Sequence, residues 1–413
     1  MTRSYTWPVE RLARDRRWQL AAVSLLAVVG WLVLWDTTRP RTSWDSLMYH
    51  RIALEYIGAS VAEQEATAWT LFATYASPGD VDLVEAGIRE GGSPWDAMDE
   101  PSRERWVDVY RSRPLYALLV AAGYPLFDLR APLLVSAASV LLFTVSMALG
   151  VGRIVGFGAG LAAVLFSFAN PLLATWLIFL QPDGLAVALW TACLALGALF
   201  IHRGTWRWLV LLGAAAIALS FTRPLGVFLP LVLGTGTLAA LAARRPEWKR
   251  LGLGTGAAAL AAAIFTAYSY LLGLPTVTDA LQDLPTRHFL RPEVADPLMW
   301  TIEVAAAQIV DPLLPTLAGN PALWGAALIG LVGLIAVGRS WALAPFVAAI
   351  PILPLAYLIH PQLSEAPRTM APIWVSVHLG MAMAFVTVVT SLQRMRPPDR
   401  TVDDDGTHEA LPA

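Results

Sequence analysis

The sequence is poor in charge and in the residues that build covalent or metal-bound scaffolds. Cys193 is the only cysteine, which excludes an intrachain disulfide and a site made of several thiolates. It lies in an apolar run, where a small buried residue is the expected role. Lys249 is the only lysine, and no block of basic residues indicates a nucleic-acid partner. Charged residues make up 15% of the chain, against about a quarter in soluble proteins, which argues against a large soluble core.

Long apolar runs take the place of charge. The 413 residues are 56% hydrophobic, and their mean hydropathy is +0.56. This predicts an all-α polytopic membrane protein with about twelve transmembrane helices. The predicted spans are 18–35, 115–127, 132–150, 154–168, 172–180, 185–201, 209–221, 225–241, 251–272, 322–337, 341–359 and 371–392. Since a crossing takes about 20 residues, the shorter ones are expected to be tilted or partly re-entrant.

The arginines before the first span predict a cytoplasmic N-terminus, residues 1–17. No small-residue cleavage site follows this span, so it is expected to be retained rather than removed as a signal peptide. Residues 18–393 form the predicted transmembrane domain, and residues 394–413 a polar, disordered cytoplasmic tail. The expected location is the plasma membrane, with both termini cytoplasmic.

Two long polar segments are predicted to lie outside. The first, residues 36–113, carries fourteen acidic residues against eight arginines, and the second spans residues 273–320. Basic residues such as Arg203 and Arg207 then face the cytoplasm, as the positive-inside rule requires. Arg153 is the exception, since this scheme leaves it on the outside.

The stretch 45–58 opens the first outside segment and predicts an interfacial helix. Asp45, Tyr49 and Tyr56 fall on one helical face, while His50 falls on a polar side. Such an amphipathic helix is expected to lie in the membrane interface, which puts Asp45 at the level of lipid headgroups. The alternative is that Asp45 simply stabilises a helix N-terminus, as aspartate commonly does.

Ionisable residues gather at the outer ends of the predicted spans. They are Asp36, Asp45, Arg113, Asp183, Arg223, His360, Glu365 and Arg368. Each has an ordinary structural alternative: an arginine can anchor a helix, and Asp183 can be a first-turn acid. His360 and Glu365 are too few to indicate a metal. Together, however, a carboxylate can deprotonate a hydroxyl, and arginine forks can hold a departing phosphate.

Several short motifs share this order and sidedness. They are Asp45-Ser46-Leu47-Met48-Tyr49, Arg113-Pro114-Leu115-Tyr116, Pro182-Asp183, Thr222-Arg223-Pro224, and Arg368 before the last span. In this arrangement the chain resembles the GT-C superfamily of integral-membrane glycosyltransferases, which use polyprenyl-phosphate sugars. The resemblance extends over most of the chain.

The resemblance implies inverting transfer of a hexose or pentose to a cell-envelope glycan, lipid or protein at the outer face of the membrane. Asp45 matches the general base of the family, and Asp36 is a rival for that role. Arg223 and Arg368 would hold the donor phosphate, while Tyr49, Arg113, Asp183 and His360 would contact substrate. No obligatory metal or other cofactor is predicted, because Ser46 stands where many members carry a second acid; a divalent cation is left open.

Two other classes of function stay open at this point. A transporter or flippase of a lipid-linked substrate would carry polar groups at mid-membrane and often repeated halves. The sequence has no evident internal repeat, and the centres of its long spans are apolar. A non-catalytic relative that only scaffolds an envelope complex would keep Asp45 without turnover.

Overall fold

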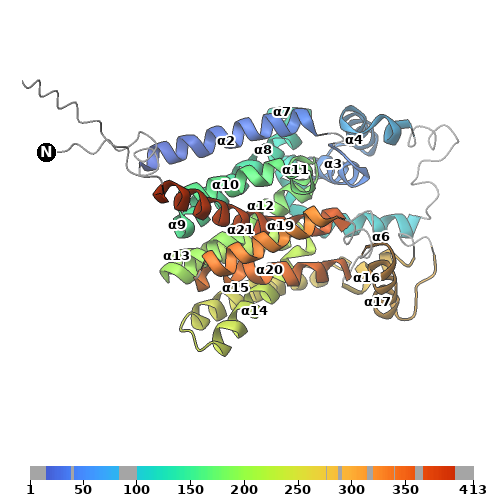
Figure 1. Ribbon diagram of the computed structural model, residues 1–413. Coiled ribbons are helices and arrows are strands. Elements are labelled where there is room, and N and C mark those ends of the chain that lie inside the picture. The colour runs from blue at the N-terminus through green and yellow to red at the C-terminus, as the bar shows by residue number, and fades with distance from the viewer. Residues whose placement is uncertain are drawn as a thin grey trace, which may run out of the picture.

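The computed structural model describes residues 15–38, 41–82, 100–275, 277–286, 291–313, 320–338, 340–358 and 366–395. Within these ranges every regular element is a helix, as the hydropathy predicted. Most helices run side by side in one bundle (Figure 1). The predicted site residue His360, its neighbour Glu365, and most of the predicted N-terminal segment and tail lie outside the described residues.

Six described helical segments are long and apolar enough to cross a membrane. They are α2 (Arg16–Thr37), Pro114–Val155, α12 (Pro182–Arg203), Pro224–Ala242, α15 (Trp248–Leu271) and Pro367–Gln393. A bent pair of α10 (Phe157–Ala169) and α11 (Pro171–Ile178) passes the same test as one span. Three shorter apolar segments are α13 (Trp206–Ser220), Pro321–Val337 and Trp341–Ala356. The predicted count of twelve spans is therefore not confirmed.

The difference arises at two places where one apolar segment was predicted as two spans. Predicted spans 115–127 and 132–150 belong to the single segment Pro114–Val155. The backbone turns within it at Asp128, which has a φ of 49° and separates α7 (Pro114–Phe127) from α8 (Ala131–Val145). The predicted spans 154–168 and 172–180 form the bent pair, whose axes differ by 86°.

The sharp bend between α10 and α11 follows from its sequence. Pro171 has no backbone N–H and starts α11, while the Asn170 side chain accepts a hydrogen bond from Leu172 N at 3.0 Å. Two polar contacts with the ring nitrogens of His378 complete the junction. Ser167 Oγ lies 3.0 Å from His378 Nδ1, and Asn170 Nδ2 lies 3.0 Å from His378 Nε2. The bend is thus tied to α21 (Ala366–Met395) by polar contacts inside the bundle.

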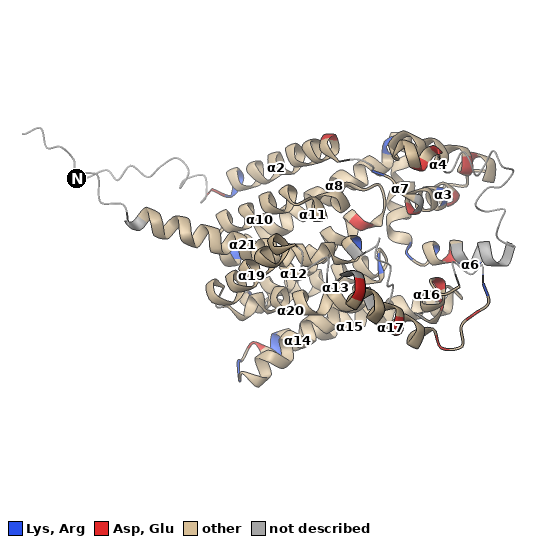
Figure 2. Ribbon diagram, turned by 45° about the vertical axis from the view of Figure 1, so that its right-hand side comes forward, with Lys and Arg blue, Asp and Glu red and all other residues tan. Residues whose placement is uncertain are grey.

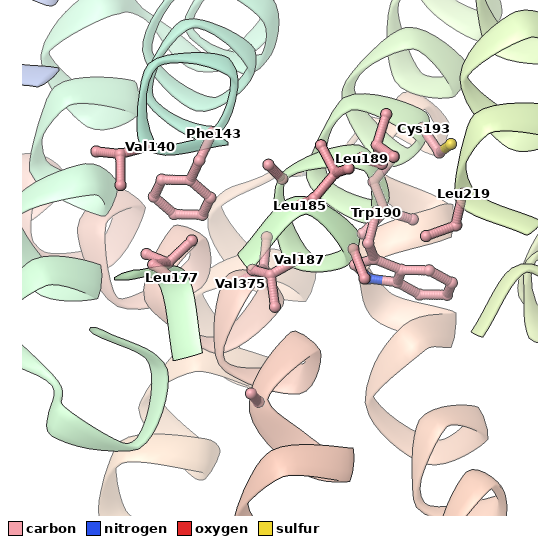
Figure 3. Packing of buried hydrophobic residues seen from close by; sticks show 14 of the residues in the cluster. Val140, Phe143, Leu177, Leu185, Val187, Leu189, Trp190, Cys193, Leu219 and Val375 are labelled. Atoms are coloured by element: carbon pink, nitrogen blue, oxygen red, sulfur yellow. The ribbon is translucent and has the colours of Figure 1, made fainter. Parts of the chain in front are cut away.

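Helix α12 forms the centre of the bundle, and nearly all of its length is buried. Figure 3 shows Trp190 and Cys193 of this helix close to Leu219 of α13, with Phe143 of α8 on another side. Trp190 and Cys193 are both fully buried. The prediction that the lone cysteine is a small buried residue is confirmed.

The described parts of the two segments predicted to lie outside form helices at one end of the bundle (Figure 1). They are α3 (Trp44–Tyr56), α4 (Val61–Tyr75), α6 (Glu100–Arg111), α16 (Val277–Asp283) and α17 (Pro297–Gln308). Figure 2 shows acidic residues concentrated on these helices. Arg105 of α6 joins the two segments, because its guanidinium lies 2.5 Å from Asp279 Oδ1 and 2.6 Å from Glu293 Oε1.

Helix α3 is more deeply buried than its predicted amphipathic pattern implied. His50, expected on the polar side, is fully buried, and its Nε2 lies 3.5 Å from the hydroxyl of Tyr116 in α7. Burial lowers the pKa of His50 to about 3, so its ring is neutral at physiological pH. The prediction of a polar face was wrong at His50 because α7, distant in sequence, covers it.

Arg153 also differs from its predicted position. The charges of Arg16, Arg203 and Arg207 act on its guanidinium, so the four arginines share one end of the bundle. The twelve-span scheme had put Arg153 at the end opposite the other three. Once Pro114–Val155 is a single segment, Arg153 is no longer an exception to the grouping of basic residues.

Candidate functional site

Four charged side chains from separate parts of the chain meet at the end of the bundle that carries α3 and α6. Arg368 of α21 is the hub: its Nη2 lies 2.5 Å from Asp45 Oδ2, and its Nε lies 2.9 Å from Asp183 Oδ1. A second bond, from Nη2 to Asp183 Oδ2 at 2.9 Å, makes the contact with Asp183 bidentate. The structure therefore brings Asp45, Asp183 and Arg368, three of the predicted site residues, into direct contact.

Arg223 completes the group of charges. Its Nη2 donates to Asp183 Oδ2 at 2.6 Å and lies 3.9 Å from Asp45 Oδ2. The backbone positions it through the turn Thr222-Arg223-Pro224, since Arg223 is extended and Pro224 begins the short helix η3 (Pro224–Phe228). Two carboxylates thus face two guanidinium groups, which makes the group nearly neutral in a largely buried place. We call Asp45, Asp183, Arg223 and Arg368 the charged cluster.

Asp45 lies in the first turn of α3, where the helix dipole favours a negative charge. Tyr110 of α6 donates its hydroxyl to Asp45 Oδ1 at 2.9 Å. Burial raises the pKa of Asp45, but the charge of Arg368, the Tyr110 hydrogen bond and the charge of Arg113 outweigh it, so the pKa lies below its usual value. Asp45 is consequently ionised at neutral pH.

The two carboxylates of the cluster differ in access. The Asp45 side chain is 22% exposed, whereas that of Asp183 is 9% exposed. Asp183 receives bonds from both arginines and from Gln181 Nε2, the last at 2.6 Å. Asp183 is therefore saturated with donors and holds the arginines, while Asp45 is the carboxylate that an entering molecule can reach.

Gln181 connects the two carboxylate-bearing helices. Its Oε1 accepts from Ser43 Oγ at 2.6 Å and lies 3.3 Å from Ser46 Oγ, both at the start of α3. Its Nε2 donates to Asp183, in the first turn of α12. Gln181 is fully buried, so this bridge fixes α3 against α12. Sequence reasoning missed it, although a polar residue directly before Pro182-Asp183 in an apolar region was a usable signal.

The close packing of α11 against α12 places an aromatic ring beside Arg368 of the cluster. A Cβ on Gly184 would lie 2.5 Å from Leu177 O, so only glycine permits this close approach of the two helices. Trp176 of α11 then stands with its ring centroid 5.9 Å from Arg368 Cζ. This is within the range of a cation–π contact, which helps to hold the guanidinium in place.

Tyr49 of α3 has a buried hydroxyl that lies beside the cluster. Its Oη has no hydrogen-bond partner among the described residues. Burial raises the pKa of Tyr49 to about 12 even though the nearby Arg113 lowers it, so the phenol is neutral and can donate. A buried polar group without a partner is costly, which makes this hydroxyl a candidate contact for a bound molecule.

Two other predicted site residues, Arg113 and Asp36, lie outside the hydrogen bonds of the charged cluster. Arg113 lies near enough for its charge to act on Asp45 and Tyr49, yet no hydrogen bond links it to either. Asp36, the predicted rival of Asp45, is exposed in the last turn of α2 and is not among the partners of the described cluster. Tyr110 is a further site residue that was missed; its place in α6, just before Arg113, was the available signal.

The chemistry available here is that of a carboxylate and two guanidinium groups. Asp45 can accept a proton, and the arginines offer donors in a fork suited to a phosphate or carboxylate. In the part of the chain that is described, no group of three or more His, Cys, Asp or Glu side chains has the arrangement of a metal site.

Comparisons with known proteins return no relative. No family model, no curated protein sequence and no solved structure matches this chain.

Proposed function

We propose that this protein is an integral-membrane glycosyltransferase of GT-C type that uses a polyprenyl-phosphate-linked sugar as its donor. The observation that carries the proposal is the charged cluster itself. An ionised, accessible Asp45 stands beside two arginines at one end of an apolar helical bundle. A lipid-linked donor presents its phosphate and sugar at such a membrane surface.

The proposed topology has ten crossings. Six long segments, one bent pair and three shorter segments give this number, and an even number returns both termini to one side. The positive-inside rule assigns the end with Arg16, Arg153, Arg203 and Arg207 to the cytoplasm. The charged cluster then belongs at the outer face of the plasma membrane, under the helices of the two outside segments.

In the proposed reaction, Asp45 acts as general base. A hydroxyl of the acceptor gives its proton to Asp45 while its oxygen attacks the anomeric carbon of the donor sugar. The bond between that carbon and the phosphate oxygen breaks, and polyprenyl phosphate leaves with the bonding electrons. A single displacement of this kind inverts the configuration at the anomeric carbon.

Arg223 and Arg368 stabilise the negative charge that develops on the departing phosphate. Asp183 orients both guanidinium groups for this task through the bonds described above. The neutral Tyr49 hydroxyl supplies a further donor to phosphate or sugar. Because guanidinium groups already provide positive charge, an obligatory metal is not part of the proposal, and addition of a chelator is its direct test.

Transport of the lipid-linked substrate is the competing proposal, since a polar group does lie within the bundle. That group consists of His378, Ser167 and Asn170. Ser167 Oγ donates to Ala163 O at 2.8 Å, so it accepts from His378 Nδ1, and Asn170 donates to Nε2. Both ring nitrogens are thereby satisfied in a neutral histidine, which suits a structural brace better than a binding site for cargo.

The test is transfer of radiolabelled sugar from a panel of polyprenyl-phosphate sugars to membrane acceptors. We expect one donor to label an acceptor with the unaltered protein, and Asp45→Asn to reduce the rate by about 10²- to 10⁴-fold. Asp36→Asn is the matched variant, because it removes an exposed acid outside the cluster, and its rate should stay near that of the unaltered protein. Retained activity in Asp45→Asn would contradict the assignment of Asp45 as the general base. Flipping of the lipid carrier in liposomes without sugar transfer would favour transport.

A further inference from the structure

The end of the bundle opposite the charged cluster carries arginines without acidic partners. They are Arg16 at the start of α2, Arg153 in α9 (Gly152–Val155), Arg203 at the end of α12 and Arg207 in α13, and the charges of the other three act on Arg153. All four are exposed. Among the described residues, none of them forms an ion pair with a carboxylate. Four like charges drawn together from four helices repel each other, which favours an anion between them.

Asp15 and Glu247 do not neutralise this group. Asp15 accepts a hydrogen bond from Arg17 N at 2.8 Å, which is a helix cap. Glu247 forms no ion pair with a described residue, and its buried Oε2 has no hydrogen-bond partner there. Two exposed tryptophans are close in sequence to these arginines: Trp18 in α2 follows Arg16, and Trp206 in α13 precedes Arg207. Tryptophan at such positions is typical of the membrane–water interface.

A cavity with mainly apolar side chains in its wall lies beside α9, the helix that carries Arg153. It measures about 220 Å³, and Ile154 and Val155, the residues that directly follow Arg153, form part of its wall. Met383, Val386 and Thr387 of α21 form the opposite part. The wall carries no charged side chain. An arginine on the helix that forms part of such a wall complements a molecule with an anionic head and a hydrocarbon chain.

We infer that this end of the protein binds one anionic phospholipid of the leaflet it faces, with the phosphate on the four arginines and part of an acyl chain in the cavity. The membrane surface attracts basic side chains in general, at about 1 kcal/mol each, which is a factor of about five in affinity. The inference adds a defined site to that general attraction, because the arginines converge and the cavity receives the chain. It does not depend on the proposed transferase activity.

The test measures lipid binding to the full-length protein in detergent. Dioleoylphosphatidylglycerol and dioleoylphosphatidylcholine are titrated while thermal unfolding and bound lipid are followed, the latter by native mass spectrometry. We expect the anionic lipid alone to raise the unfolding temperature. The double variant Arg153→Gln/Arg207→Gln should weaken its binding by about 30-fold, since two charges are lost. Arg245→Gln, an exposed arginine of the turn between α14 (Leu229–Ala242) and α15, is the matched control and should bind within twofold of the unaltered protein.

A second variant separates the head from the chain. Val386→Phe fills the cavity, so it should weaken dioleoylphosphatidylglycerol by about tenfold while leaving binding of the short-chain dihexanoyl lipid and of inorganic phosphate unchanged. A loss of about fivefold in Arg245→Gln, the amount that general attraction gives for one charge, would reduce the effect to general surface charge and overturn the site. Equal binding of the two dioleoyl lipids, or undiminished binding in Val386→Phe, would overturn it as well. The unfolding temperature without lipid identifies any variant that has failed to fold.

Discussion

The two ends of the helical bundle hold arginines in opposite ways. In the charged cluster, Arg223 and Arg368 are largely buried and share two carboxylates. At the other end, Arg153 and its neighbours are exposed and have no described carboxylate partner. Burial explains the contrast, since a buried guanidinium without a counter-charge is costly, whereas an exposed one stays hydrated or meets lipid headgroups. The same residue type therefore serves a built polar site at one end and a surface at the other.

Removing Asp183 should break this contrast with the largest effect on stability. Asp183→Asn deprives both arginines of their shared partner, so the buried cluster gains net positive charge and comes to resemble the opposite end. Breaking a buried ion pair costs about 3–5 kcal/mol. We expect a clearly lower unfolding temperature in detergent and a strong loss of sugar transfer. Asp36→Asn provides the comparison, and equal stability of the two variants would show that Asp183 does not hold the arginines.

Substitution of Gln181 should have the second-largest effect on stability. Gln181→Glu can still accept from Ser43 and Ser46, but it loses the donor to Asp183 and puts a second carboxylate beside it. We expect a destabilisation of about 1–3 kcal/mol, the usual cost when a buried polar group loses its partner. Because Gln181 positions rather than contacts substrate, kcat should fall more than KM rises. Ser46→Ala removes the weaker 3.3 Å contact with Gln181 and the 3.0 Å capping bond from Ser43 N, but it leaves the bond between Gln181 and Asp183 intact. It is the comparison variant and should have a smaller effect.

Sequence reasoning anticipated what depends on composition and short spacing. Apolar runs predicted the helices, and charges at helix ends predicted that Asp45, Asp183, Arg223 and Arg368 would converge. It did not anticipate the bridge by Gln181, whose partner Ser43 is 138 positions away. Such a contact exists only once the helices have packed. The span count differed for a related reason, because an 86° bend leaves no mark on hydropathy that distinguishes one broken crossing from two.

The Tyr110 hydroxyl provides a test of the electrostatics of the charged cluster. Its hydrogen bond is one of the contributions that keep the pKa of Asp45 below the usual value. Tyr110→Phe should therefore raise that pKa, and the acid limb of kcat/KM should move to higher pH because the base must be ionised. The stability that ionised Asp45 contributes is present above its unfolded-state pKa and is lost as pH falls through the lower folded-state value. In Tyr110→Phe that contribution falls by about 1.5 kcal/mol, the lower end of the range for a hydrogen bond to a charged group. A pH–rate profile identical to that of the unaltered protein would exclude the coupling.

We expect the smallest change in stability from a substitution at the end of the bundle opposite the charged cluster. The direction of this change distinguishes the two groups of arginines. Arg207→Gln removes one of four mutually repelling charges and one contact of a guanidinium with the Trp208 ring, whose centroid lies 4.8 Å from Cζ. Loss of the repulsion stabilises the protein, and loss of the ring contact destabilises it. Substitutions of exposed residues usually change the free energy of unfolding by less than about 0.5 kcal/mol. In zwitterionic detergent without anionic lipid, the unfolding temperature should thus be unchanged or slightly higher. Arg223→Gln in the charged cluster should lower it, because Asp183 then loses a buried partner. If both variants destabilised the protein equally, burial would not be the property that separates the two groups of arginines.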